Sequence, residues 1–283
     1  MNTKKDVYQI VTDRILAEME KGIIPWQKPW ITAGSCINYV SRRPYSLLNM
    51  LLLGEPGEYL TYNQVKSLGG YVKRGAKSRI VFFYKVQQKE VAKADGTVEL
   101  EKYSIPRYYE VFHISDTAGI ESKLESSSVV LSPVEEAEKL LRAYEEREPK
   151  LTVQRDKASD SAYYSVSKDS IVVPALSQFE EIAEYYSTTF HEYTHSTGIE
   201  GRCARGIEND STFGSDSYSK EELVAEFGAA MLLCKVGIDT SKAIKNSASY
   251  IDSWASKFRQ DRRLIISAAS KAEQAVSYIL GEK

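Results

Sequence analysis

Histidine and cysteine are scarce in this chain of 283 residues, which has three of each. Cys36, Cys203 and Cys234 lie far apart without CxxC pairing, which argues against a disulfide framework and against a cysteine zinc site. No apolar run approaches the roughly 18 residues of a membrane helix, and the first residues lead into an amphipathic stretch rather than a secretory signal. The sequence therefore predicts a cytoplasmic protein that does not enter the membrane.

Charge is divided unevenly along the chain, although the net charge is only −2. Residues 1–120 hold 17 Lys and Arg against 12 Asp and Glu, a net of +5, whereas residues 121–283 have a net of −7. The serine-rich segment 121–128 has the composition of a linker. We therefore expect two domains, residues 1–125 and residues 126–283, with a polyanionic partner for the first.

The hydrophobic pattern predicts an α+β first domain and a mainly helical second domain. In the first domain we expect helices over residues 3–21 and 63–68, an apolar block over 47–53, and strands over 80–86 and 108–113. In the second domain we expect helices over residues 133–147, 177–197, 219–236 and 247–280, and a small β-hairpin formed by residues 161–165 and 170–173. The expected fold class is thus α+β with two domains.

Two of the three histidines form the pattern His191-Glu192-x-x-His195. On a helix, residues i and i+4 share a face, so both imidazoles can point at one metal ion. Glu192 can then reach a water molecule on that ion. This spacing is typical of a catalytic zinc site, and the alternative is a helix with two solvated or capping histidines.

A catalytic zinc ion usually has three protein ligands. His113, the remaining histidine, lies on a predicted strand of the other domain, so a carboxylate is the better candidate. Glu222 and Glu226 lie one turn apart on a predicted helix. We predict Glu222 as the third ligand and Glu226 as the acceptor of a histidine N–H. One alternative is that Glu222 and Glu226 exchange these roles. Another is that Glu222 caps the helix and Glu226 is a solvated charge.

These groups predict a zinc-dependent metallopeptidase of the HExxH, gluzincin-like type. Zn²⁺ would activate water, and Glu192 would take the proton and deliver it to the leaving amine. Tyr218 is a candidate donor to the oxyanion. Residues 171–173 would offer an edge strand to an extended peptide, which implies a protein substrate or partner.

Basic and aromatic residues interleave in the first domain. Aromatic faces that stack on bases, combined with basic groups, bind single strands without sequence preference. No pattern typical of duplex readers is present, so single-stranded DNA is the favoured partner. The alternative is a set of core aromatics beside a solvated basic turn. The predicted contacts are Trp26, Trp30, Arg42, Arg43, Tyr45, Lys73, Arg74, Lys77 and Arg79.

The two halves together resemble the ArdC-type antirestriction proteins of conjugative plasmids and other mobile elements. In the first half the resemblance lies in residues 20–30, 43–45 with Asn49, 59–64, 69–70 and 107–112. In the second half it lies in residues 191–198, 213–215, 221–226, 229–230 and 250–254. The chain differs from the family pattern at His113, at Ser196 and in residues 201–205.

The resemblance implies a single-stranded-DNA-binding domain, a zincin-like metallopeptidase domain and a role in protecting incoming DNA from host restriction. It places metal-binding histidines at His191 and His195, the catalytic glutamate at Glu192 and the third ligand within residues 221–226. The protein substrate or host restriction factor stays unidentified. The alternatives are a non-catalytic single-strand-binding protein with a structural or vestigial metal site, and a peptidase whose basic half recognises acidic protein.

Overall fold

The computed structural model describes residues 6–27, 36–92, 98–124, 132–207, 216–239 and 248–282, except for the side chains of residues 89–101 and 216–218. The helices are α1 (Val7–Met19), α2 (Leu47–Leu53), α3 (Tyr62–Ser67), α4 (Pro133–Arg147), α5 (Ile182–Ser196), α6 (Asp216–Val236), α7 (Ala248–Gln260) and α8 (Leu264–Leu280). The strands are β1 (Cys36–Asn38), β2 (Gly57–Leu60), β3 (Tyr71–Val72), β4 (Arg79–Ala92), β5 (Val98–His113), β6 (Thr117–Ala118), β7 (Thr152–Gln154), β8 (Tyr163–Ser165) and β9 (Ser170–Val172). Within the described ranges, no helix is long and apolar enough to span a membrane.

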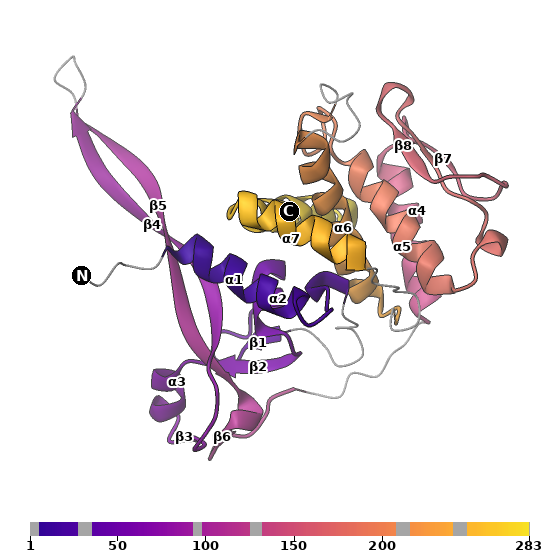
Figure 1. Cartoon of the computed structure of the whole chain (residues 1–283). Helices are drawn as coiled ribbons and strands as arrows, with labels where there is room; N and C mark the ends of the chain where they lie inside the picture. Colours follow the sequence, from indigo (N-terminus) through magenta and orange to yellow (C-terminus); the bar gives the residue numbers. More distant parts are fainter. Residues whose placement is uncertain are drawn as a thin grey trace.

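The first half is organised around one long antiparallel hairpin. β4 and β5 pair over their whole length, and β2 and β1 extend the sheet in the order β1-β2-β5-β4. Because β2 pairs with β5 only at its last two residues, most of the hairpin projects beyond the rest of the sheet (Figure 1). A second small sheet, β3-β6, lies near its base with α3 (Figure 1).

The amide of Asn49 connects α2 to the edge of this sheet. Its Nδ2 donates to the Phe82 carbonyl at 2.9 Å, and its Oδ1 accepts from the Phe82 N–H at 2.6 Å. Asn49 is buried, so the side chain supplies the partners that a further strand would give to β4. The helix therefore covers the base of β4 while Asn49 satisfies the backbone N–H and carbonyl of Phe82.

The second half combines helices with a three-stranded sheet, which lies at the outer edge of the molecule against α5 (Figure 1). The strand order is β7-β9-β8, with β7 parallel and β8 antiparallel to β9. β9 is thus the central strand, and the prediction that residues 171–173 form an edge was wrong. The hairpin of β8 and β9 was predicted. The pairing of β7 with β9 was not predicted, because β7 lies more than a dozen residues upstream and no turn pattern in the sequence connects the two strands.

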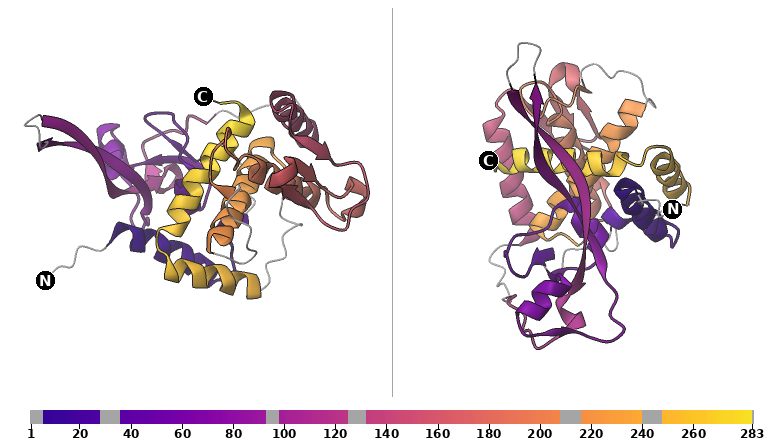
Figure 2. Two further views of the ribbon diagram at one scale, coloured as in Figure 1. Left: turned by 90° about the horizontal axis from the view of Figure 1, so that it is seen from above. Right: turned by 90° about the vertical axis from the view of Figure 1, so that its left-hand side faces the viewer.

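The two halves share one hydrophobic core. α1, Trp26 and α2 pack with side chains of α6, α7 and α8 in a single buried cluster. Trp26 is 1% exposed and contacts Phe227, Trp254 and Phe258 through its ring. Figure 2 shows α1 and α7 side by side along one side of the molecule. The expected junction between residues 125 and 126 lies outside the described residues.

The α+β, two-domain fold class is confirmed, with differences in detail. The predicted strands over residues 80–86 and 108–113 are parts of the longer β4 and β5 and lie toward the base of the hairpin. The predicted helix over residues 247–280 is two helices, because the chain turns at Asp261, whose side chain accepts from the Arg263 N–H at 2.9 Å. Such a turn needs neither Gly nor Pro, and the hydrophobic pattern continues through it.

We expect Asn49→Ala to lower the free energy of unfolding by about 2–3 kcal/mol, because the buried Phe82 N–H and carbonyl lose their partners. Urea denaturation of the full chain measures this change. The matched control is Asn63→Ala at an exposed position of α3, where we expect a change of about 0.5 kcal/mol or less. Equal losses in the two variants would contradict the proposed role of Asn49.

Candidate metal centre

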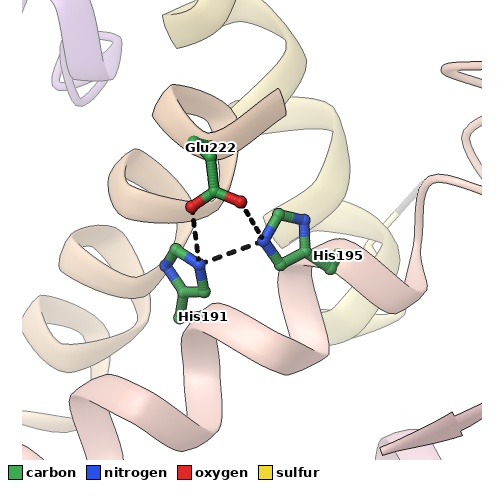
Figure 3. A group of neighbouring side chains, drawn as sticks. All are labelled: His191, His195 and Glu222. Atoms are coloured by element: carbon green, nitrogen blue, oxygen red, sulfur yellow. Dashed lines mark hydrogen bonds and ion pairs between the residues drawn. The ribbon is translucent and has the colours of Figure 1, made fainter. Parts of the chain in front are cut away.

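Three predicted ligands meet where α5 lies against α6. His191 and His195 are one turn apart on α5, and their Nε2 atoms lie 3.0 Å apart. Glu222, in the second turn of α6, places Oε2 3.4 Å from His191 Nε2 and Oε1 3.5 Å from His195 Nε2. Figure 3 shows both rings and the carboxylate directed at one point.

These distances fit a divalent metal ion. Ligand atoms about 2.0–2.1 Å from a tetrahedral ion lie about 3.4 Å from one another. The three donor atoms here all lie within 4.8 Å of one another, and the closest contacts are near the tetrahedral value. Two imidazoles and one carboxylate are also a donor set that leaves a fourth position for water or substrate. The residues present can therefore hold such an ion.

The close approach of α5 and α6 depends on Gly228. A Cβ atom at this position would lie 2.5 Å from the side chain of Thr194 on α5. Thr194 is fully buried and its hydroxyl donates back to the Phe190 carbonyl. Because glycine has no side chain, the two helix backbones can approach closely enough for Glu222 to reach both histidines.

A buried ion pair between Glu221 and Arg205 contacts His195 at Nδ1, the ring nitrogen that does not face Glu222 and His191. Glu221 Oε1 lies 3.3 Å from His195 Nδ1, and the Arg205 guanidinium donates to both Glu221 oxygens at 2.6 and 2.8 Å. Arg205 also donates to the Thr197 hydroxyl and is 2% exposed. A metal ion at this position would displace the proton on Nε2, and His195 would then keep its Nδ1 proton, donate it to Glu221 and direct the Nε2 lone pair toward the ion.

Gly198 lets the Arg205 segment fold back over the end of α5. A Cβ at Gly198 would come 2.7 Å from Ile207 and 3.0 Å from Arg205 Nη2. The Arg205 N–H also donates to the Gly198 carbonyl at 2.8 Å. Through Arg205, the segment 201–205 thus contributes directly to the environment of His195.

The charges of the site are strongly coupled. Burial lowers the pKa of His195, but Glu221 and Glu222 outweigh this effect and raise it to about 9. Burial raises the pKa of Glu222, yet the two histidines hold it well below its usual range. Burial also raises the pKa of Glu192, although both histidines and a backbone hydrogen bond from Tyr164 oppose the shift. A carboxylate with a raised pKa is a stronger base, as proton abstraction requires.

The position predicted for Glu226 is occupied by Glu221. The Glu226 carboxylate accepts a hydrogen bond from the Tyr250 hydroxyl on α7, so it points away from the histidines. The prediction was wrong because Glu221, adjacent to Glu222, is the carboxylate that lies beside His195. Tyr218 lies in the first turn of α6, and its side chain lies outside the described residues.

A cleft of about 430 Å³ opens in front of these groups. Glu192 lies on its wall and is 8% exposed. Strand β8 borders the cleft, and as an outer strand of its sheet it can pair with an extended chain. The residues that line the cleft are Ala162, Tyr163, Tyr164, Val166, His191, Glu192, His195, Ile207, Glu221 and Glu222.

Two aromatics predicted to contact DNA are buried instead. Trp26 is enclosed in the shared core, and Tyr45 is 7% exposed, packed against Tyr59 and Phe83. Neither ring can stack on a base without unfolding its surroundings. These assignments were wrong because the sequence pattern does not distinguish an aromatic that faces the core from one that faces solvent. Trp30 lies outside the described residues.

The predicted basic contacts divide into two groups. Arg42 forms an ion pair with the buried Glu58, and Arg79 donates to Glu55 at 2.6 Å and to the Tyr59 hydroxyl at 3.0 Å. The charges of these two arginines are therefore paired within the fold. The side chains of Arg43, Lys73, Arg74 and Lys77 are exposed, and the last three lie in the segment between β3 and β4.

Comparison with known families assigns both halves. Residues 5–112 match the N-terminal domain of anti-restriction factor ArdC, and residues 136–271 match the zincin-like metallopeptidase family. The crystal structure of antirestriction ArdC from the R388 plasmid, in its metal-free form, is 29% identical, with a TM-score of 0.75 over 98% of this chain and 99% of that one. The Mn(II)-bound structure of that protein is also 29% identical, with a TM-score of 0.68 over 98% and 97% of the two chains.

Two curated relatives align along nearly the whole chain. A DNA primase TraC of Escherichia coli is 32% identical over 98% of this chain, which spans only 27% of that protein. The uncharacterized protein y4eC of Sinorhizobium fredii is 29% identical over 98% of this chain and 92% of its own length.

These matches define a two-domain protein in which an ArdC N-terminal domain precedes a zincin-like metallopeptidase domain. The resemblance to the ArdC-type antirestriction proteins is thus confirmed by the match of the first half to the ArdC N-terminal domain and by the similarity of the chain to the R388 structure. The similarity to the R388 crystal structure extends over both halves, since it covers 98% of this chain and 99% of the R388 chain.

We expect Glu221→Gln to weaken zinc binding by about 10–100-fold, because the neutral amide accepts the His195 N–H less strongly and releases Arg205. Competition with a chromogenic chelator measures the affinity, and circular dichroism checks that the variant is folded. Glu226→Gln is the matched control and should bind zinc as the unaltered chain does. A larger loss of zinc affinity in Glu226→Gln than in Glu221→Gln would indicate that Glu226, not Glu221, orients the histidine.

Proposed function

We propose that this chain is an antirestriction protein of a mobile element that acts in the cytoplasm, binds single-stranded DNA and hydrolyses a peptide bond at a zinc site. The convergence of His191, His195 and Glu222, with Glu192 on the wall of the same cleft, is the observation that supports hydrolysis most directly. The R388 relative, an antirestriction protein by name and encoded on a plasmid, supports the biological role. The division into domains of residues 1–125 and 126–283 is part of the proposal.

The catalytic roles follow from the positions of the side chains. His191, His195 and Glu222 would hold a divalent ion, proposed to be Zn²⁺, which when bound lowers the pKa of water and polarises a carbonyl oxygen. Glu192 takes a proton from the attacking water and delivers it to the leaving amine. Glu221 and Arg205 keep His195 oriented during this cycle. Tyr218 stays the proposed donor to the oxyanion.

A protein in extended conformation is the proposed substrate. β8 borders the cleft and offers an outer strand to which a peptide backbone can pair, whereas β9 is covered on both sides. A substrate paired with β8 would pass in front of Glu192, which receives a backbone hydrogen bond from Tyr164 of that strand. A host restriction factor is a partner consistent with the family's role.

The purified chain should contain about one zinc ion per molecule, the stoichiometry of a single three-ligand site. Mass spectrometry of the metal content after dialysis measures it. His191→Ala combined with His195→Ala should remove the ion, because two of the three ligands are lost. A wild-type chain that takes up no zinc would contradict the metallopeptidase proposal.

Glu192→Gln separates hydrolysis from binding. We expect the variant to keep its zinc and its DNA binding but to cleave a quenched-fluorescent peptide library about 10²–10⁴ times more slowly, the usual contribution of a general base. Protection of incoming DNA should fall with it. Full protection by the variant would instead favour a non-catalytic single-strand-binding protein whose metal site is structural or vestigial.

Single-stranded DNA binding is supported by the basic first half and by its match to the ArdC N-terminal domain. We expect a gel shift with a labelled single strand at low salt that weakens steeply as salt rises, because phosphate contacts release counterions. A chain that binds acidic protein but no single strand at low salt would favour the third hypothesis, a peptidase with an acidic target.

A further inference from the structure

The projecting part of the β4–β5 hairpin has two chemically different faces. Directly paired residues of an antiparallel ladder have their side chains on the same face. Phe83 pairs with Arg107, Lys85 with Ile105 and Gln87 with Tyr103, and Val81 pairs with Tyr109. These pairs alternate with Phe82–Tyr108 and Tyr84–Pro106, which therefore lie on the opposite face.

We propose that single-stranded DNA lies along one of these faces, the Phe83 face, defined by Phe83, Lys85, Tyr103, Arg107 and Tyr109. This proposal rests on the single-strand binding proposed above and assigns its location. It replaces the buried Trp26 and Tyr45 by aromatics that reach solvent.

The aromatic rings of the Phe83 face are exposed although they are large. Phe83 is 45% exposed, Tyr109 49% and Tyr103 39%. The rings of Phe83 and Tyr109 lie 6.1 Å apart and are tilted by 62°, and Tyr45 supports Phe83 from the core side. Exposed rings on a rigid strand pair are suited to stacking on unpaired bases, since every base has an aromatic face.

The charge of the Phe83 face complements a phosphate backbone. Lys85 and Arg107 are exposed between the rings. Among the described side chains of the two strands, this face carries no carboxylate, whereas Glu110 lies on the opposite face, paired with Ile80. Exposed rings and cations therefore lie next to one another on this face, the combination that binds the bases and the phosphates of a single strand.

The opposite face is partly used by the fold. Phe82 is buried against the shared core, and the Tyr84 hydroxyl lies 3.3 Å from that of Tyr8 on α1. From Tyr103 to Tyr109 the Phe83 face extends about 20 Å at the rise of a β-strand. Figures 1 and 2 show the hairpin at the far side of the molecule from α5 and β8, so DNA on this face leaves the peptidase cleft open.

Fluorescence anisotropy with the full chain and a labelled oligothymidine of about 16 nucleotides tests the location. The Phe83→Ala, Tyr109→Ala double variant should bind at least about tenfold more weakly, because two stacking surfaces are lost. The Lys85→Gln, Arg107→Gln double variant should lower the slope of log affinity against log salt by about 1.4, or 0.7 for each phosphate contact. The second variant changes only exposed side chains, so it tests the face independently of hairpin packing.

Matched controls lie on the opposite face. Tyr108→Ala removes an aromatic of similar exposure, and Lys102→Gln removes a cation from the same hairpin. Both should bind within about twofold of the wild type. If the wild-type chain binds the oligonucleotide and the Phe83-face variants bind it equally well, the proposed location is wrong. The location is also wrong if the controls lose as much affinity as the Phe83-face variants. Either result would leave single-strand binding itself intact. A wild-type chain that binds no single strand would contradict the proposed function itself, and a duplex that competes equally would refute stacking on unpaired bases.

Discussion

The contact between α5 and α6 is the interaction on which the candidate metal centre depends. Helix α5 brings the two histidines to one face by its own periodicity, but the third donor comes from another helix. Gly228 permits the two backbones to approach, and Glu222 then lies within 3.5 Å of both imidazoles. A larger residue at position 228 would separate the helices and leave the histidines without a carboxylate.

The same contact supplies the groups that orient His195. Glu221 precedes Glu222 in α6, so one turn of this helix provides both a carboxylate at the metal position and a carboxylate behind the histidine. Arg205 balances the second charge in a setting where an isolated ion would be costly. The segment between α5 and α6 therefore contributes to the chemistry of the site as well as connecting the helices.

The shared core links the half that matches the ArdC N-terminal domain to the half that matches the zincin-like metallopeptidase family. Trp26 packs its ring against Phe227 of α6, the helix that carries Glu222. The Glu273 carboxylate on α8 accepts from the backbone N–H of Leu47 at the start of α2. Because the two halves of the chain share one core, the projecting hairpin and the candidate metal centre have a defined relative position, with helices between them (Figure 1).

The sequence by itself determined the features that depend on local spacing. The HExxH pattern predicted that His191 and His195 lie side by side, and their Nε2 atoms are 3.0 Å apart because i and i+4 share a helix face whatever surrounds the helix. The α+β fold class and most helices followed from hydrophobic periodicity in the same way. Glu222 was also named, since it lies in a carboxylate-rich helix and the site needed a third donor.

Only the tertiary structure decided which of several equivalent residues face a given partner. Glu221 rather than Glu226 lies behind His195 because of how α6 is rotated against α5, and periodicity within one helix does not specify that rotation. Trp26 faces the core and Phe83 faces solvent, although both are aromatics among basic residues. These outcomes depend on contacts between residues distant in sequence, where packing and burial select one orientation among those that local pattern allows.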